Sequence, residues 1–311
     1  MHFDGTIWRP PYEAASLLLQ ATAGCTHHRC KFCTLYYDLP FPFRMSPLEE
    51  IESDLQEAQL RNTDPVAMLS ARLQGLPGPE PLRRAFLVGA NPFVLKPRRL
   101  LDIAELIGKY IPSVQTIGCF ARVTDITLKS DEDLSDLHRA GYDGLTIGME
   151  TGDDAALRFM HKGYAAADIV EQCRRLDRAG IRYSFFYLAG ISGAGRGEEG
   201  ARETAAICNQ LHPALIGVNM LTVYPESELY QEIRRGAWTE ESELEKYREI
   251  RTLLENLEIP TRFAAYGASN AFQFQGDLPE EREALDAALG RIIETAREED
   301  LRRYRAGLRH L

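Results

Sequence analysis

The chain has 311 residues, of which 44% are hydrophobic and 26% charged, as in a globular protein that buries a sizeable core. Its formal net charge of -10 argues against a nucleic-acid partner, because binding to phosphates relies on a basic surface. Apolar runs are far shorter than the roughly 20 residues of a membrane span, and the first residues do not resemble a signal peptide. We therefore expect no membrane contact and a cytoplasmic location, where the six cysteines stay reduced.

Short apolar runs alternate along the chain with helix-like segments. The runs are mostly continuous, which is typical of parallel strands that are buried on both faces. Six such β-then-α units predict one α/β domain with a parallel sheet and helices outside it, open or barrel-like. The expected strands are residues 16–21, 85–88, 114–120, 143–148, 181–189 and 215–224.

One of the intervening helices has a clear start signal. In "SDEDLSDLHRAG", Ser130 is the expected N-cap and Asp133 completes a capping box three residues later. We expect the helix to start there and to end at Gly141.

Two regions depart from this pattern. Residues 62–82 are rich in proline and glycine and predict an insertion that carries a short helix. After residue 235 the chain consists of charged helical segments, whose charge runs we interpret as solvated faces. We expect one main domain over residues 15–235 and a helical C-terminal extension over residues 236–311.

The segment "AGCTHHRCKFC" brings Cys25, Cys30 and Cys33 together directly after the first expected strand. In parallel α/β folds, ligands gather at the carboxyl ends of the strands. A structural zinc site would need a fourth ligand, which His27 or His28 could supply. An iron–sulfur cluster with only three thiolates keeps one iron open to an outside ligand. The position after a strand favours the reactive cluster over structural zinc.

With this C-x4-C-x2-C motif the chain resembles the radical S-adenosylmethionine (SAM) superfamily, including its uncharacterised Elp3-, MiaB- and NifB-like members and its coproporphyrinogen-oxidase-like members. The commonest motif, C-x3-C-x2-C, has one residue fewer in the first gap. The resemblance covers about residues 15–235 and implies a partial (β/α)6 radical SAM barrel of parallel strands. It also implies that Cys25, Cys30 and Cys33 hold a [4Fe-4S] cluster whose open iron is chelated by SAM.

Three further segments resemble SAM-binding motifs of the superfamily. "GISGAGRGE" at residues 190–198 matches G-I-x-G-x-G-x-x-E, and "IGMETG" at 147–152 resembles G-x-E/Q-S-G. "VGANP" at 88–92 corresponds to G-G-E-P but has Ala90 and Asn91 in place of Gly and Glu. The resemblance assigns no catalytic residue, and it implies SAM contacts from Phe32, Gly89, Asn91, Arg122, Glu150, Gly190 and Ile191.

Plainer interpretations of some of these residues remain open. Asn91 could belong to an ordinary strand-to-helix turn, and Arg122 could form a surface ion pair. Glu150 could be an acid at a helix N-terminus. Cys119, on the third expected strand of the resembling region, is expected to be a buried structural thiol.

The resemblance implies an enzyme that cleaves SAM reductively to methionine and a 5'-deoxyadenosyl radical, which abstracts hydrogen from an unidentified substrate. We expect a small-molecule substrate and an external electron donor of the flavodoxin or ferredoxin type. RNA modification and methyl transfer are alternatives within the superfamily. A zinc-stabilised binding module is the alternative outside the enzymes.

Overall fold

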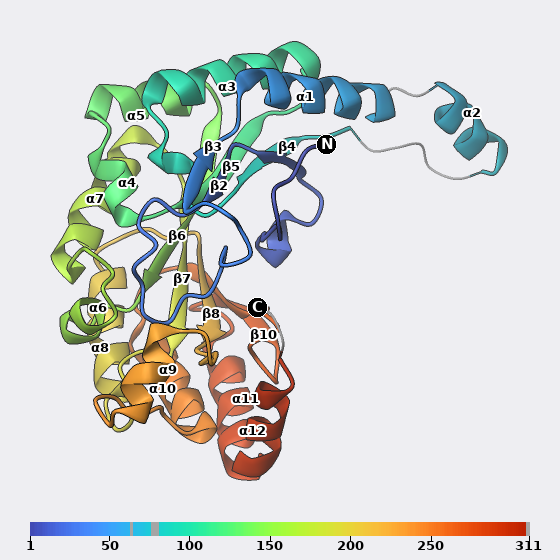
Figure 1. The fold of residues 1–311 in the computed structure, drawn as a ribbon. Coiled ribbons are helices and arrows are strands. Elements are labelled where there is room, and N and C mark those ends of the chain that lie inside the picture. The colour runs from blue at the N-terminus through green and yellow to red at the C-terminus, as the bar shows by residue number, and fades with distance from the viewer. Residues whose placement is uncertain (63–64, 76–80, 309–311) are drawn as a thin grey trace.

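The computed structural model describes residues 1–62, 65–75 and 81–308. Its main sheet has the order β1-β4-β5-β6-β7-β8-β9-β10, and all neighbouring strands are parallel except β9 and β10. Because β1 and β10 lie at opposite edges, the curved sheet is a partial barrel, and helices cover its outer side (Figure 1). The strands are β1 (Leu17–Gln20), β4 (Arg84–Val88), β5 (Thr116–Ala121), β6 (Tyr142–Glu150), β7 (Tyr183–Ala189), β8 (Leu215–Met220), β9 (Thr261–Ala265) and β10 (Phe274–Leu278).

This architecture confirms the predicted fold class, and the six expected strands correspond to β1 and β4 to β8. Four strands were not predicted. β9 and β10 come from the C-terminal extension and continue the main sheet, so this region is not only helical. β2 (Thr22–Gly24) and β3 (Phe43–Met45) form a separate antiparallel pair.

Helices alternate with most strands of the main sheet along the chain. In the part of the chain that the structure describes, no helix is long and apolar enough to cross a membrane. α5 begins with the predicted capping box, in which Ser130 Oγ accepts from Asp133 N at 3.0 Å. The helices are η1 (Pro11–Glu13), α1 (Leu48–Asn62), α2 (Pro65–Leu73), η2 (Pro92–Val94), α3 (Pro97–Tyr110), α4 (Val123–Thr127), α5 (Asp131–Arg139), α6 (Asp154–Phe159), α7 (Ala166–Ala179), α8 (Gly197–Cys208), α9 (Glu228–Arg234), α10 (Glu243–Asn256), α11 (Arg282–Thr295) and α12 (Glu298–Ala306).

The expected insertion at residues 62–82 lies partly outside the described residues, which omit 63–64 and 76–80. Its described part contains α2, which projects away from the sheet (Figure 1). The division of the chain into residues 15–235 and 236–311 stays a prediction.

The main core lies between the outer face of the sheet and the helices. On β5 its members are Ile117, Cys119 and Ala121, every second residue, as the alternation of side chains in a strand requires. Cys173 on α7 and Cys208 on α8 are fully buried in the same core. Cys119 therefore points to the helices, and all three thiols pack as small apolar groups.

An ion pair occupies the amino end of the barrel. Arg84 at the start of β4 donates to both carboxylate oxygens of Glu13, at 2.8–3.0 Å. It also donates to the carbonyl of Gly144 at 3.2 Å. A Cβ at Gly118 or Gly144 would lie 2.1 Å or 2.6 Å from its Nη2, so both glycines leave room for the guanidinium. The pair links η1 to three strands.

We expect Arg84→Met to lower the free energy of unfolding by about 3 kcal/mol, because it leaves the Glu13 carboxylate buried without its counter-ion. The Glu13 side chain is only 2% exposed. Arg139→Met is the matched control, since Arg139 is 71% exposed and its loss should change stability by less than about 0.5 kcal/mol. Urea unfolding of both variants measures this, and equal effects would contradict the prediction.

Candidate functional site

The three clustered cysteines lie in the loop of residues 25–42, between β2 and β3. The β2–β3 pairing closes this loop by placing Gly24 opposite Phe43. Gly24 has a φ of 78°, and a Cβ there would lie 2.2 Å from the carbonyl oxygen of Pro42, so only glycine fits the closure. The sequence analysis expected the thiols directly after the first strand, whereas the structure inserts β2 between them.

Backbone hydrogen bonds fix the cysteine-bearing loop to two distant segments. The amide of Lys31 donates to the carbonyl of Met160 at 3.2 Å, and its carbonyl accepts from Leu229 N at 2.8 Å. Its Nζ pairs with Glu232 at 2.8 Å and lies 4.3 Å from the ring centroid of Phe159. The loop is thereby held against the end of α6 and the start of α9.

The thiols lie within electrostatic range of one another. Burial, together with charge on Cys30 and Cys25, raises the pKa of Cys33 to about 12. Burial also raises the pKa of Cys30. Metal binding would deprotonate such thiols. Over the described residues, no group of three or more His, Cys, Asp or Glu side chains is placed to hold one metal ion.

The two histidines of the loop have protein partners. His27 Nε2 contacts the carbonyl oxygen of His161, and burial lowers the pKa of His27. The ring of His28 stacks on Tyr37 with the centroids 5.4 Å apart. Neither histidine therefore belongs to a ready-made zinc site with the three thiols.

A partly buried ion pair lies beside the cysteine loop. Glu150, at the carboxyl end of β6, has a φ of 62° and contacts Lys162 Nζ at 3.0 Å. The same Nζ lies 5.7 Å from the ring centroid of Phe32 and 5.6 Å from that of Tyr164. Although burial opposes it, the charge of Glu150 raises the pKa of Lys162. Asp153 caps α6, so Glu150 is not the N-terminal acid of that helix.

Arg122, which follows β5, approaches the same ion pair, and it shares a contact to Asp125 with Asn91, which follows β4. Arg122 Nη2 donates to the carbonyl of Lys162, and its backbone N donates to Asp125 at 2.8 Å. Asn91 Nδ2 donates to Asp125 at 3.1 Å and to Thr26 Oγ1 at 2.9 Å. Burial raises the pKa of Asp125 to about 6. Among the described residues Arg122 forms no ion pair, so the surface pair that the sequence left open is not observed.

Two polar atoms in this cluster are buried without a hydrogen-bond partner, namely Asn91 Oδ1 and Arg122 Nε. Buried polar groups in proteins are nearly always paired, so an acceptor and a donor left open at neighbouring positions favour a polar ligand. The amino and carboxylate groups of an amino acid have this complementary chemistry. The residues thus fit the methionine part of SAM.

Gly89 allows the backbone after β4 to lie close to Thr22 of β2. Its φ is 120°, and a Cβ there would lie 2.2 Å from Thr22 Oγ1 and 2.3 Å from the Thr22 carbonyl oxygen. Thr22 is the first residue of β2, which leads into the cysteine loop. Gly89 therefore sets the distance between β4 and that loop.

A small apolar cluster joins Phe32 to the predicted adenine-binding segment. Ile191 is fully buried in it together with Leu188, Leu221 and Met160, and Phe32 packs against them. Gly190 N is already engaged by Glu249 Oε2 at 2.6 Å. The structure therefore brings Phe32 and Ile191 together, whereas the amide of Gly190 has a protein partner.

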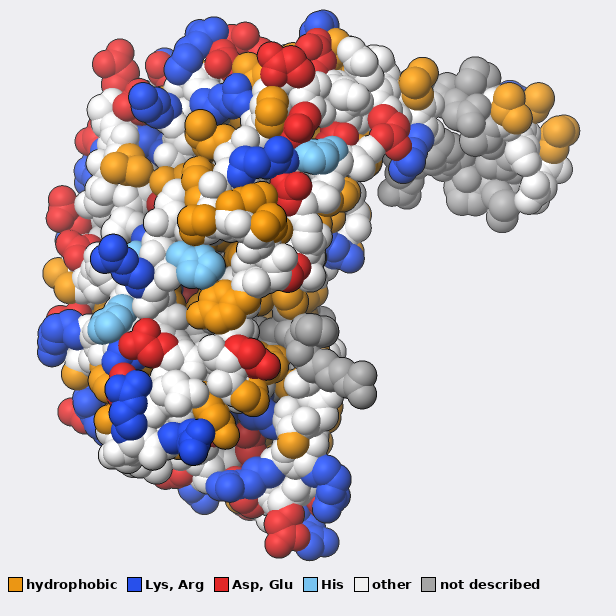
Figure 2. All heavy atoms as spheres, in the orientation of Figure 1, with side chains coloured by type: hydrophobic (Ala, Val, Ile, Leu, Met, Phe, Trp, Pro, Cys, Tyr) orange, Lys and Arg blue, Asp and Glu red, His pale blue; other side chains and the backbone are white. Residues whose placement is uncertain are grey.

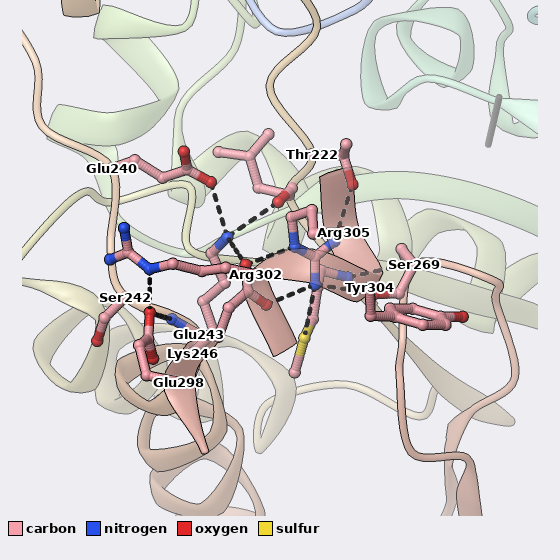
Figure 3. Close-up of polar contacts among 12 residues, drawn as sticks. Thr222, Glu240, Ser242, Glu243, Lys246, Ser269, Glu298, Arg302, Tyr304 and Arg305 are labelled. Carbon is pink, nitrogen blue, oxygen red and sulfur yellow. Dashed lines mark hydrogen bonds and ion pairs between the residues drawn. The ribbon is translucent and has the colours of Figure 1, made fainter. Parts of the chain in front are cut away.

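The C-terminal helices contact the residues at the end of β8 through a buried charged network (Figure 3). Arg305 of α12 donates to both oxygens of Glu243, at 2.6 Å and 2.8 Å, and to Thr222 Oγ1 at 2.8 Å. Lys246 Nζ contacts Glu243 at 3.2 Å and Glu240 at 2.9 Å. A cavity of about 400 Å³ lies beside this network and is lined by Thr222 and Glu243, among others.

This burial corrects the interpretation of the C-terminal charge runs as solvated faces. Lys246 and Glu249 are fully buried, and Glu243 and Arg305 nearly so. Glu243 and Lys246 share one face of α10 with the buried Ile250. Their spacing of three and four residues in the sequence is the signal that could have indicated their burial. Tyr187 also donates to Glu249, which fixes α10 against β7.

Lys162 and Asp125 are the site residues that sequence reasoning missed. Lys162 lies in "MHKGY" at residues 160–164, a segment to which the sequence analysis gave no role. Asp125 had no sequence signal, because its importance comes from its contacts with Asn91 and Arg122. The roles of both residues can be recognised only in the folded structure, where the ends of separate strands meet.

The fold and the three-thiol loop define an α/β enzyme architecture with its ligands at the carboxyl ends of the strands. A family model described as the radical SAM superfamily matches residues 19–205, more than half of the chain. The chain therefore belongs to the radical SAM superfamily and is a radical SAM enzyme. Members of this superfamily use a [4Fe-4S] cluster and SAM and need an external electron donor.

Solved structures with this fold include three radical SAM proteins. The methyltransferase TsrM from Kitasatospora setae, solved with cobalamin and a [4Fe-4S] cluster, has a TM-score of 0.52 at 16% identity over 71% of this chain and 37% of its own. Coproporphyrinogen III oxidase (HemN) from Escherichia coli has a TM-score of 0.52 at 15% identity over 77% and 50%. Methylornithine synthase (PylB) has a TM-score of 0.51 at 14% identity over 93% and 85%.

These likenesses confirm the fold alone, because all three identities are low. The chain spans about a third of the length of TsrM and half of that of HemN. Among curated proteins, none matches the chain in sequence.

We expect Gly89→Ala to destabilise the protein by more than about 2 kcal/mol, because the added Cβ collides with the backbone of Thr22 and φ is positive. Gly108→Ala on α3 is the matched control. A Cβ at Gly108 meets nothing within 4 Å, so this helical change should be neutral or stabilise by about 0.5–1 kcal/mol. Thermal unfolding compares them, and a neutral Gly89→Ala would show that the close approach is not required.

Proposed function

We propose that Cys25, Cys30 and Cys33 hold one [4Fe-4S] cluster and that SAM binds beside it. The observation that carries this proposal is the meeting of the three-thiol loop with the buried, unpartnered Asn91 Oδ1 and Arg122 Nε. Three thiolates leave one iron of a cubane open, and an amino acid can chelate it. With both bound, the cluster would supply the electron, received from an external donor, for cleavage of SAM to methionine and a 5'-deoxyadenosyl radical, which would abstract hydrogen from the substrate.

Each proposed SAM-binding residue has a distinct task. Asn91 accepts from the amino group of SAM, and Arg122 binds its carboxylate. Glu150, held by Lys162 at 3.0 Å, accepts from the ribose hydroxyls. Phe32 and Ile191 contact the adenine, Gly190 shapes the turn next to it, and Gly89 keeps the backbone close.

The surrounding fold supports this chemistry by limiting access of water. The cysteine loop, α6 and α9 are joined by backbone hydrogen bonds over the carboxyl end of the sheet. A reactive radical requires such a protected site. We also propose an external electron donor of the flavodoxin or ferredoxin type and a cytoplasmic location.

The zinc-stabilised binding module is the less favoured candidate. It needs a fourth ligand, and His27 and His28 already have other partners. Methyl transfer is the alternative reaction on the substrate within the superfamily.

We expect anaerobically reconstituted protein to contain about four irons per chain and, after reduction, the electron paramagnetic resonance signal of a [4Fe-4S] cluster. Alanine replacement of any one of Cys25, Cys30 and Cys33 should abolish formation of 5'-deoxyadenosine, because two thiolates do not hold the cluster firmly. Iron analysis, the spectrum and product chromatography are the measurements.

Cys173→Ala and Cys208→Ala are the matched controls, since both thiols lie in the core away from the loop. They should retain cleavage and cost at most some stability through a small cavity. Stoichiometric zinc without a reducible cluster would favour the binding module. Full cleavage by Cys30→Ala would overturn the proposed ligand set.

We propose a small molecule as the substrate rather than nucleic acid. The chain has 46 acidic and 36 basic residues, and both kinds are interspersed over the visible face of the molecule (Figure 2). On this face the described residues form no continuous basic stripe of the kind that a phosphate backbone requires.

We expect total transfer RNA to bind more weakly than about 10 µM at about 150 mM salt, because the net negative charge repels phosphates. Fluorescence polarisation with the full chain measures this, with a salt titration as its control. Tight binding that resists salt would reverse the assignment and make RNA modification the leading function.

A further inference from the structure

The side-chain amide of Asn91 is held in one orientation in the buried interior. Asn91 is fully buried, and its Nδ2 donates to both carboxylate oxygens of Asp125 at 3.1 Å and to Thr26 Oγ1 at 2.9 Å. Its Oδ1 is also buried and has no hydrogen-bond partner among the described residues. The donor side of the amide is therefore occupied by the protein, and its acceptor side is open to a ligand.

The carboxylate of Asp125 is the partner that selects this orientation. An amide can turn by 180° about its Cβ–Cγ bond, which exchanges the acceptor oxygen and the donor nitrogen with almost no change of shape. An ionised carboxylate only accepts hydrogen bonds, so it pairs with Nδ2 and repels Oδ1. The hydroxyl of Thr26 can donate or accept and would tolerate either orientation. Asp125 therefore decides which atom of Asn91 stays open.

Asp125 is itself fixed in place. Its Oδ2 accepts from Arg122 N at 2.8 Å, in the capping box that begins α4. Lys129, just after α4, donates to the carbonyls of Asp125 at 3.3 Å and Leu95 at 3.2 Å, which holds α4 against the turn that follows Asn91. Burial raises the pKa of Asp125 to about 6, and the hydrogen bonds from Arg122 and Asn91 oppose the rise. The carboxyl is therefore ionised at neutral pH.

We propose that Asp125 is a positioning residue for SAM, which keeps Asn91 Oδ1 open to the amino group and excludes the inverted amide. An ammonium group only donates hydrogen bonds, so it cannot pair with Nδ2. In the motif G-G-E-P a glutamate stands at the position of Asn91, whereas here the negative charge lies behind the amide, on Asp125. The proposal rests on the proposed function, because it takes Asn91 as the contact to the amino group.

Equilibrium dialysis of SAM and of 5'-methylthioadenosine against the anaerobically reconstituted full chain tests this role. Methylthioadenosine has the adenine and ribose of SAM but neither its amino nor its carboxylate group. We expect Asp125→Asn to weaken SAM binding by about tenfold, because the amide of Asn91 can then invert, and to change methylthioadenosine binding by less than about twofold. A general loss of structure would weaken the binding of both ligands.

Asp133→Asn is the matched control. Asp133 caps α5 as Asp125 caps α4, and its carboxylate accepts from Ser130 N at 2.8 Å. This variant should bind both ligands as the wild type does. The exchange that combines Asn91→Asp with Asp125→Asn should restore SAM binding to within about threefold of the wild type, because the carboxylate then faces the ammonium group directly and the amide behind it donates to that carboxylate.

Equal SAM affinity in Asp125→Asn and the wild type would overturn the positioning role, as would a parallel loss of both ligands or an exchange that restores nothing. If Asp125→Asn does not fold, Asp125→Ser takes its place, since the shorter side chain can still accept from Arg122 N but leaves Asn91 without the carboxylate. A wild type without a cluster signal and without SAM binding would overturn the proposed function and this role with it. A wild type with both, and with variants of equal affinity, would overturn this role alone.

Discussion

The ion pair between Glu150 and Lys162 is the contact on which the site depends. It lies where β6 ends, and through Lys162 it reaches the ring of Phe32, while the carbonyl of Lys162 accepts from Arg122. A nearly buried lysine is tolerated only with a compensating charge, so the carboxylate and the segment after α6 must stay together. The left-handed backbone at Glu150 is consistent with strain that the surrounding packing maintains.

A second charged network holds the C-terminal extension to the barrel. Arg305, Glu243 and Lys246 connect α12 and α10 to the residues after β8, and Glu249 continues the contact to Gly190 (Figure 3). The extension thus supports the proposed adenine-binding segment in addition to lengthening the sheet. Because these charges are buried and mutually paired, removal of one partner would leave another charge buried without compensation.

Local signals in the sequence were sufficient for the main elements. Continuous apolar runs predicted β1 and β4 to β8, and the capping box at Ser130 predicted the start of α5. β9 and β10 were missed because they lie between the charged helices of the extension, and β9 joins the sheet only by pairing with β8, which is distant in the chain. The cysteine loop was expected directly after β1, whereas the structure inserts β2 before it, and the closure of the loop by β2 and β3 depends on a contact between Gly24 and Pro42.

The sequence by itself determined the parallel α/β architecture, the three-thiol motif and the family resemblance, because periodicity and spacing are local properties. Only the tertiary structure decided which charges are buried and that Asn91 and Arg122 keep open polar atoms. These features arise where the ends or inner faces of several strands converge. Residues far apart in the chain come into contact there, and no local sequence pattern indicates such a contact.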